Sequence, residues 1–328
     1  MYRLADRWIW DFWLARDGDA YHVFHLQAPR SLGSPDLRHR AATIGHAVSS
    51  DLRSWSPLPD ALEAGAPGAF DDLATWTGSV IRTEGGWMLF YTGISRADDL
   101  RAQRIGAARS PDLVSWERVD GFVLEADGRW YETLSGGGQE EVWRDPWAYR
   151  DPRTGRYHLF VTAHVNHGPA DGRGVIGHAW SDDLSSWTVG PPVSSPGEFV
   201  HLEVPQVEQI GGRYRLFFCA PDWGHSAARL ARPEVSRQTG THYLVADDPL
   251  GPYRLERDDF LLSDDGGRYY AGRVAETPDG WVMLAWLERD RDGAFVGELS
   301  DPMPLCVEQD GQLRVEVDKS GPEGLPPG

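Results

Sequence analysis

The sequence has few cysteines and few basic residues. Its 328 residues include two cysteines, Cys219 and Cys306, which lack any CxxC or Cys/His spacing typical of zinc ligands. Neither a disulfide framework nor a structural zinc site is therefore indicated. The 32 basic residues are outnumbered by 50 acidic ones, and the formal net charge of -18 repels phosphate backbones and anionic surfaces. The charge argues against nucleic acid and membranes as partners.

Long apolar runs and helical periodicity are also missing. No stretch approaches the roughly 18 apolar residues of a membrane-spanning helix, and the start, MYRLADRWIW, has no basic region followed by an apolar run. We therefore expect a cytoplasmic protein, as a monomer or a small homo-oligomer. Residues 319–328 are rich in proline and glycine without an apolar pattern, which predicts a disordered tail.

Short apolar runs that open with an aromatic residue repeat along the chain. Each follows a glycine by one to three positions, which is typical of a turn that leads into a buried strand. The runs are 21–27, 87–93, 157–163, 214–220 and 281–287. A second element recurs after the first three: IGHAVSSDLRSW (44–55), IGAARSPDLVSW (105–116) and IGHAWSDDLSSW (176–187), with a degraded copy at 241–253. Five units in one order predict an all-β, five-bladed β-propeller with four-stranded blades rather than two stacked sandwiches.

We expect this propeller to form a single domain over residues 1–318. The predicted blades are roughly 8–66, 70–130, 140–196, 199–262 and 268–317. The first strand of each blade lines the central channel of a propeller, and these strands should lie at 10–16, 76–82, 144–150, 203–209 and 271–276.

Three of the predicted inner strands begin with a carboxylate. These are Asp11 in WDFW, Asp145 in RDP and Glu203 in EVPQV. Because rotation relates the blades, matching positions on different inner strands should meet at one end of the channel. A carboxylate inside the apolar run WIWDFW is costly unless it has a partner or a chemical role. We therefore interpret the three acids as one site.

Two carboxylates that face one pocket are the equipment for cleaving a glycosidic bond. One protonates the leaving oxygen while the other attacks carbon or activates water, and a third can bind hydroxyls or tune the pKa values of the others. Trp10, Trp13 and Trp76 offer flat apolar faces for a sugar ring. The alternative is that the acids are ordinary strand residues neutralised by Arg144 or exposed at the channel mouth.

Several stretches resemble glycoside hydrolase family 32, the invertase and fructanase group, in order through all five predicted blades. They include WTGSV (76–80), LFYTG (89–93), RDP (144–146), EVPQV (203–207) and GELSDPMPLCVEQDGQLRVEV (297–317). The segment WDFW is similar to the Trp-Asp-x-Trp nucleophile motif of family 68, the levansucrase group. Family 43 belongs to the same superfamily. Unlike family 32, this chain ends soon after the fifth blade, so we expect no C-terminal β-sandwich.

The resemblance implies a retaining enzyme that acts on β-fructofuranosides through a covalent intermediate, with a small carbohydrate as substrate and no cofactor or metal. Asp11 would be the nucleophile, Glu203 the general acid/base, and Asp145 the group that binds hydroxyls and stabilises the transition state. Since Glu203 must hold its proton near neutral pH, we expect its surroundings to raise its pKa. The expected substrate-binding residues are Trp10, Trp13, Trp76, Arg144, His201 and Gln27.

Other histidines are expected to have structural roles. His164 and His167 in HVNH suit hydrogen bonding better than metal binding, while His46 and His178 repeat at equivalent blade positions and suggest packing. Three further functions stay open: a family 43-like inverting arabinofuranosidase or xylosidase, a glycosyl-transferring enzyme, and a sugar-binding propeller without catalysis.

Overall fold

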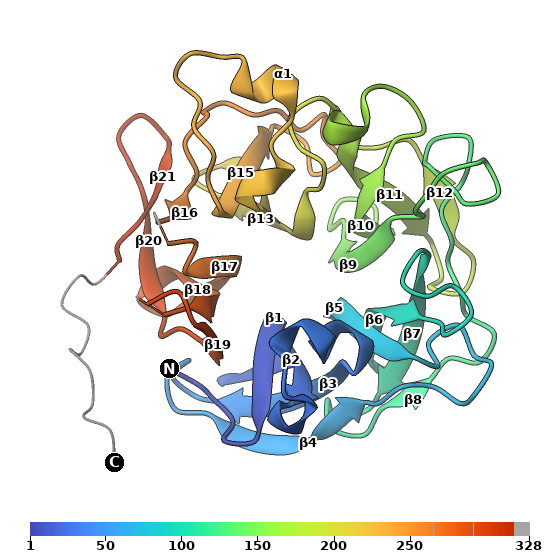
Figure 1. The fold of residues 1–328 in the computed structure, drawn as a ribbon. Helices are drawn as coiled ribbons and strands as arrows, with labels where there is room; N and C mark the ends of the chain where they lie inside the picture. The colour runs from blue at the N-terminus through green and yellow to red at the C-terminus, as the bar shows by residue number, and fades with distance from the viewer. Residues whose placement is uncertain (265, 291, 318–328) are drawn as a thin grey trace.

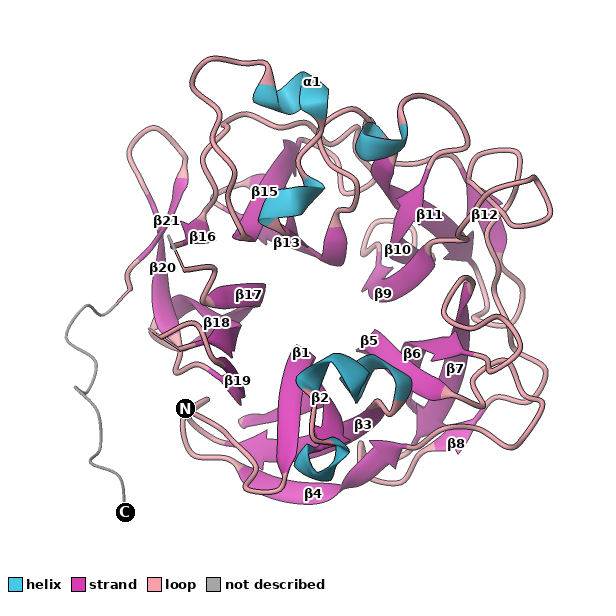
Figure 2. Ribbon diagram, in the orientation of Figure 1, coloured by secondary structure: helices cyan, strands magenta, loops and turns pink. Residues whose placement is uncertain are grey.

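The computed structural model of the protein describes residues 1–264, 266–290 and 292–317. Five antiparallel sheets form a ring, with β1, β5, β9, β13 and β17 innermost, and the helices are few and short (Figures 1 and 2). The prediction of a five-bladed propeller is confirmed. The predicted tail at 319–328 lies outside the described residues. Within the described part, no helix is long and apolar enough to cross a membrane.

Each of the first four sheets has four strands. The first sheet is β1 (Arg7–Asp17), β2 (Ala20–Pro29), β3 (Thr43–Ser49) and β4 (Ser56–Leu62). The second is β5 (Ala74–Thr83), β6 (Gly86–Ile94), β7 (Gln103–Ser110) and β8 (Glu117–Arg118). The third is β9 (Trp143–Arg150), β10 (Tyr157–His164), β11 (Gly174–Ser181) and β12 (Thr188–Gly190), and the fourth is β13 (Glu203–Ile210), β14 (Arg213–Ala220), β15 (Gly240–Ala246) and β16 (Leu262–Ser263).

The fifth sheet has five strands rather than the predicted four. It comprises β17 (Tyr269–Thr277), β18 (Gly280–Arg289), β19 (Phe295–Leu299), β20 (Met303–Val307) and β21 (Leu313–Val315). Strand β19 pairs with β18, and its Leu299 exchanges two backbone hydrogen bonds of 2.9 Å with Tyr2. Residue 2 precedes β1, so this bridge ties the first blade to the fifth and closes the ring.

Short helical turns occupy the connections. They are η1 (Arg30–Leu32), η2 (Pro35–Arg40), η3 (Ala170–Gly172), η4 (Asp222–Gly224) and α1 (Ala227–Leu230). Apolar side chains fill the spaces between neighbouring sheets, where, for example, Trp13 and Phe24 of the first blade share one core cluster with Leu89 of the second. This packing buries large aromatic area, which is the main stabilising contribution of such side chains.

The repeated Ser-x-Asp-Leu segments form one type of turn after the third strand of a blade. In the first copy, Asp51 accepts hydrogen bonds from the backbone N–H groups of Arg53 and Ser54 at 2.8 and 2.7 Å. The leucines that follow, Leu52, Leu113 and Leu184, have φ of 60, 65 and 65°. A left-handed leucine is unfavourable, so the aspartate bonds and the burial of the leucine compensate for it. The repeat in the sequence therefore records a turn rather than a binding motif.

Buried histidine pairs repeat in the first and third blades. Nδ1 of His22 lies 2.9 Å from Nε2 of His46, and Nδ1 of His158 lies 2.9 Å from Nε2 of His178, with each pair of rings stacked. Burial lowers the pKa of all four, to about 3 for His46 and His178 and about 4 for His158. These histidines are neutral in the folded protein and titrate normally once it unfolds.

We expect the free energy of unfolding to fall as pH falls below about 6.5. In that range these histidines bind protons in the unfolded chain but stay neutral in the folded protein. Each can contribute up to about 1.4 kcal/mol per pH unit between its unfolded and folded pKa values. Urea unfolding of His46→Gln/His178→Gln should show a shallower fall than the wild type between pH 6.5 and 4. The exposed His167→Gln is the control, and equal slopes in all three proteins would contradict the assignment.

Candidate active site

Each inner strand carries a β-bulge at the same level. The last regular pairs are made by Trp10, Trp76, Arg144, Glu203 and Tyr270, and the residues inserted after them are Asp11, Thr77, Asp145, Val204 and Ala271. Asp145, Val204 and Ala271 have φ of 57, 55 and 47°. A bulge re-aims the side chains beside it, so the five bulges determine what faces the central axis.

The bulges correct the prediction that the three acids hold matching positions. Asp11 and Asp145 are equivalent inserted residues, whereas Glu203 comes one position earlier, level with Arg144 and Tyr270. Without bulges, adjacent residues would point to opposite faces of a strand. The bulge removes this alternation locally, and the three carboxyl groups still interact electrostatically with one another.

Asp145 is anchored by three blades. Its Oδ2 accepts a hydrogen bond of 2.9 Å from the hydroxyl of Thr162 on β10 and one of 3.2 Å from the N–H of Val204 on β13. Its own N–H donates to Oγ1 of Thr92 on β6 at 2.9 Å. These bonds hold the positive φ of Asp145 in place, and burial raises the pKa of its carboxyl.

Asp11 has one close donor and a high pKa. The hydroxyl of Thr77 on β5 donates to its Oδ2 at 2.9 Å. Loss of hydration first, and then the nearby charge of Asp145, raise the pKa of Asp11 to about 7, with Glu203 adding a smaller rise. Thr77 and Arg38 act in the opposite direction. The charged and neutral forms of this carboxyl are thus close in free energy near neutral pH.

Glu203 has a donor on each oxygen. Nη2 of Arg144 donates to Oε1 at 2.7 Å, and the hydroxyl of Tyr270 donates to Oε2 at 2.5 Å. Arg144 also places Nε 3.5 Å from Oδ2 of Asp145 and donates from Nη1 to Gln103 at 3.2 Å. Arg144 therefore bridges two of the acids. The expected proton on Glu203 stays a prediction.

A second arginine, Arg273, supports the backbone beside the acids. Its side chain is buried, and it donates to the carbonyl oxygens of Phe12 at 2.9 Å, Val204 at 3.0 Å and Pro205 at 2.6 Å. Phe12 follows Asp11, and Val204 follows Glu203. One guanidinium from β17 thus fixes the strands that carry the expected nucleophile and the expected acid.

Among the predicted sugar-binding aromatics, Trp76 lies at the mouth and Trp13 does not. Trp76 is half-buried, and its indole N–H donates to the carbonyl of His39 at 2.7 Å. Trp10 is 2% exposed and packs edge-on to His39. Trp13 is 0% exposed and stacks on Phe24 inside the core. The expectation for Trp13 is corrected, because after the bulge its ring points between blades.

The expectation for Gln27 is also corrected. Its side chain is 1% exposed, bonds to Thr43 at 3.4 Å and packs over Gly45 within the first sheet. It pairs with Ile9, whose side chain belongs to the core cluster shared with the fifth blade. Gln27 therefore faces a neighbouring blade and not the axis.

His201, two residues before Glu203, stacks its ring on that of His164. Its Nδ1 is 2.8 Å from Nε2 of His164, and burial lowers the pKa of His201 well below its usual value. His167 instead bonds to Asn166, so His164 and His167 have separate partners. In the described part of the chain, no group of three or more His, Cys, Asp or Glu side chains is arranged to hold a metal.

The residues at the site that were not identified from the sequence include Arg38, His39, Thr77, Gln103, Tyr270 and Arg273. Tyr270 has a usable signal, since it occupies on β17 the position that Glu203 has on β13. Arg38 and His39 belong to η2, where Arg38 covers the rings of Trp10 and Phe295 at 5.6 and 4.8 Å. No motif marks η2, because its place over the mouth depends on the folded ring.

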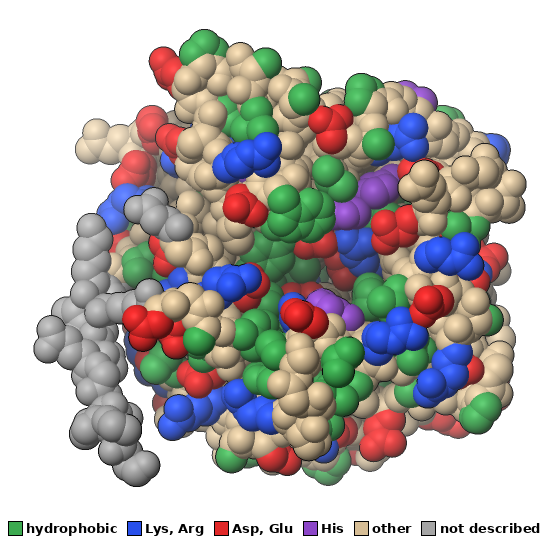
Figure 3. Space-filling view, viewed as in Figure 1, with side chains coloured by type: hydrophobic (Ala, Val, Ile, Leu, Met, Phe, Trp, Pro, Cys, Tyr) green, Lys and Arg blue, Asp and Glu red, His purple; other side chains and the backbone are tan. Residues whose placement is uncertain are grey.

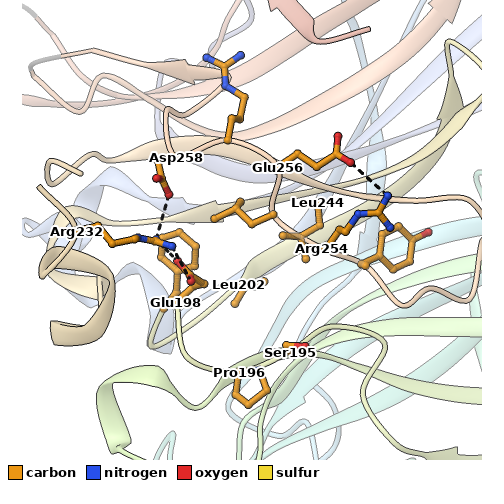
Figure 4. A pocket seen from close by; sticks show the side chains of 13 residues that line it. Ser195, Pro196, Glu198, Leu202, Arg232, Leu244, Arg254, Glu256 and Asp258 are labelled. Atoms are coloured by element: carbon orange, nitrogen blue, oxygen red, sulfur yellow. Dashed lines mark hydrogen bonds and ion pairs between the residues drawn. The ribbon is translucent and has the colours of Figure 1, made fainter. Parts of the chain in front are cut away.

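The face that carries η2 and α1 is hollowed at its centre, where acidic, histidine and hydrophobic side chains gather (Figure 3). A cleft of about 480 Å³ lies beside this mouth and is lined in part by Trp223 and Glu288. A separate cavity of about 340 Å³ is built by the segments that follow β12, α1 and β15, around Glu198, Arg232 and Asp258 (Figure 4). Asp11, Asp145 and Glu203 line neither of these two spaces.

Known proteins share the sequence pattern and the fold. A model of the glycosyl hydrolases family 32 N-terminal domain matches residues 14–294. Sucrose-6-phosphate hydrolase of Bacillus subtilis is 26% identical over 82% of this chain and 52% of its own length, so the chain spans about half of that relative. Extracellular sucrase of Zymomonas mobilis is 24% identical over 97% of this chain and 84% of its own.

Solved structures show the same fold. Inulosucrase from Halalkalicoccus jeotgali, bound to kestose, matches with a TM-score of 0.77 and 23% identity, over 99% of this chain and 92% of that one. Sucrose-6-phosphate hydrolase from Lactobacillus gasseri matches with a TM-score of 0.72 and 21% identity, over 94% of this chain and 61% of that one.

Replacement of Arg273 should destabilise the whole ring. We expect Arg273→Met to lower the free energy of unfolding by on the order of 3 kcal/mol, because three buried carbonyl groups lose their donor. Urea unfolding measures this. The exposed Arg82→Met is the matched control and should change stability by less than about 1 kcal/mol. Equal stability of both variants would show that Arg273 does not hold the inner strands.

Proposed function

Because the chain belongs to glycosyl hydrolase family 32, we propose that it is a glycoside hydrolase that cleaves β-fructofuranosides with retention of configuration. The observation that carries this is the bulged mouth, where Asp11, Asp145 and Glu203 interact around Arg144. Relatives named as a sucrase and as sucrose-6-phosphate hydrolases support a sucrose-type substrate.

In the first proposed step, the Asp11 carboxylate attacks the anomeric carbon of the fructosyl unit. The bond from that carbon to the leaving oxygen breaks as an ester bond to Asp11 forms, and Glu203 gives its proton to the leaving oxygen. Asp145 accepts hydrogen bonds from sugar hydroxyls. Its carboxylate also favours the positive charge that develops on the ring.

In the second step, a water molecule attacks the same carbon and gives a proton to Glu203. The ester bond breaks, Asp11 leaves as a carboxylate, and the product has the configuration of the substrate. Arg144 and Tyr270 are the residues that hold Glu203 in position for both proton transfers. A sugar hydroxyl in place of water would give transfer instead of hydrolysis.

Loss of either reacting carboxyl should abolish turnover. We expect Asp11→Asn and Glu203→Gln each to lower kcat on sucrose by roughly 10³-fold or more, because each removes a covalent or proton-transfer role. Assays of released fructose and glucose measure this, and an excess of glucose over fructose reports transfer. Glu117→Gln, an exposed change on β8, is the control.

The substrates and the product stereochemistry separate the alternatives. Nuclear magnetic resonance of freshly released sugar should show the β-anomer. Turnover of nitrophenyl arabinofuranoside or xyloside alone, or an inverted product, would favour the family 43-like function. Sugar binding without turnover of any of these substrates would favour a sugar-binding propeller without catalysis.

The pH profile should report Asp11. Since Asp11 attacks only as a carboxylate, kcat/KM should fall as pH falls through about 7, the pKa of Asp11 in the free site. Thr77→Val removes a bond that stabilises the carboxylate, so the pKa and the acidic limb should rise by about one pH unit. Thr188→Val, on the exposed strand β12, is the control. A limb near pH 4 in the wild type would contradict the assignment.

A further inference from the structure

The cleft beside the mouth adjoins the catalytic acids through its charged side chains. Glu288, at the end of β18, lines the cleft, and its carboxyl senses the charges of Arg38, Asp222 and Glu203. Arg38 in turn senses both Asp11 and Glu288. The cleft therefore lies close to the expected position of the glycosidic bond, on the side of the fourth and fifth blades.

An exposed tryptophan stands on the wall of this cleft. Trp223 in η4 is 62% exposed, the most exposed of the large hydrophobic side chains in the described residues. Its ring is edge-on to His201, with centroids 6.1 Å apart, and His201 is held by its stack and bond with His164. His201 lies two residues before Glu203. Trp223 therefore packs on the segment that carries the proposed acid.

The backbone around Trp223 is also braced. The N–H of Asp222 donates to the hydroxyl of Thr239 at 2.9 Å, and Arg237 donates to the carbonyl of Asp222 at 2.9 Å. An exposed indole held at the rim of a polar cleft provides a flat surface for one face of a sugar ring.

The charges of the cleft disfavour anions. Its described lining has three acids, Asp222, Asp264 and Glu288, against two arginines, Arg237 and Arg289. Nη1 of Arg237 donates to the backbone carbonyl of Asp222, and Arg289 lies 3.5 Å from Glu288. A phosphate in the cleft would therefore meet a lining that has more acids than arginines.

We propose that this cleft receives the leaving group of the fructoside, that Trp223 is its stacking surface, and that it selects a neutral sugar over a sugar phosphate. The inference rests on the proposed function and assigns to it a specificity-determining residue and a class of leaving group. The volume of about 480 Å³ is in the range of small-ligand sites.

Two substrates with different leaving groups test the role of Trp223. Trp223→Ala should lower kcat/KM for sucrose about tenfold and leave kcat/KM for methyl β-fructofuranoside within about twofold, because methanol is too small to reach the indole. Trp223→Phe should recover most of the sucrose activity. Trp130→Ala, an exposed tryptophan outside the cleft lining, is the matched control. An equal loss on both substrates, or no loss on either, would overturn the proposal for Trp223.

A comparison of a neutral substrate with a phosphorylated one tests which leaving group the cleft prefers. The wild type should have a higher kcat/KM for sucrose than for sucrose-6-phosphate, and Glu288→Gln should narrow this ratio by removing a repelling charge. A preference of the wild type for the phosphate would overturn the proposal for the cleft. Failure of the wild type to release fructose from methyl β-fructofuranoside, from sucrose and from sucrose-6-phosphate would instead overturn the proposed function, so the two failures are distinguishable.

Discussion

The side-chain bonds that join neighbouring inner strands around the central axis are the interaction on which this structure depends. The five sheets are separate, so backbone pairing within a sheet cannot set the distance between two inner strands. Asp145 receives or makes bonds with the second and fourth blades, and Arg273 joins the fifth blade to the first and fourth. The groups that hold the ring together therefore include one of the three acids and the arginine behind the other two.

This arrangement makes burial of several carboxyl groups tolerable. Arg144 lies against Asp145 and Glu203, while Asp11 has one hydroxyl donor and a more distant arginine. Burial, and then the nearby charge of Asp145, raise the pKa of Asp11 to about 7, because its one hydroxyl donor and the arginine do not offset them. Buried charges need partners, and Arg144, Tyr270 and Thr77 are donors or charge partners of these three acids.

The surroundings of the mouth come from connections rather than from blades. The helical turn η2 brings Arg38 and His39 over the acids, and η4 brings Trp223 to the adjoining cleft. The blades supply a rigid frame, and loops at one end of such a frame are free to vary without loss of the core. A change of substrate specificity that keeps the same three acids would thus require changes in these connections.

The repeated motifs allowed the five-bladed ring to be predicted from the sequence by itself. Glycine-aromatic runs and Ser-x-Asp-Leu turns are local patterns, so they predict strands and turns without knowledge of neighbours, and the family resemblance and the three acids followed from motifs. Only the tertiary structure decided the offset of Glu203, the burial of Trp13 and Gln27, and the roles of Tyr270, Arg273 and Arg38. A bulge changes the direction of every side chain after it, and contacts between neighbouring inner strands join residues about 60 to 260 positions apart, which strand periodicity does not encode.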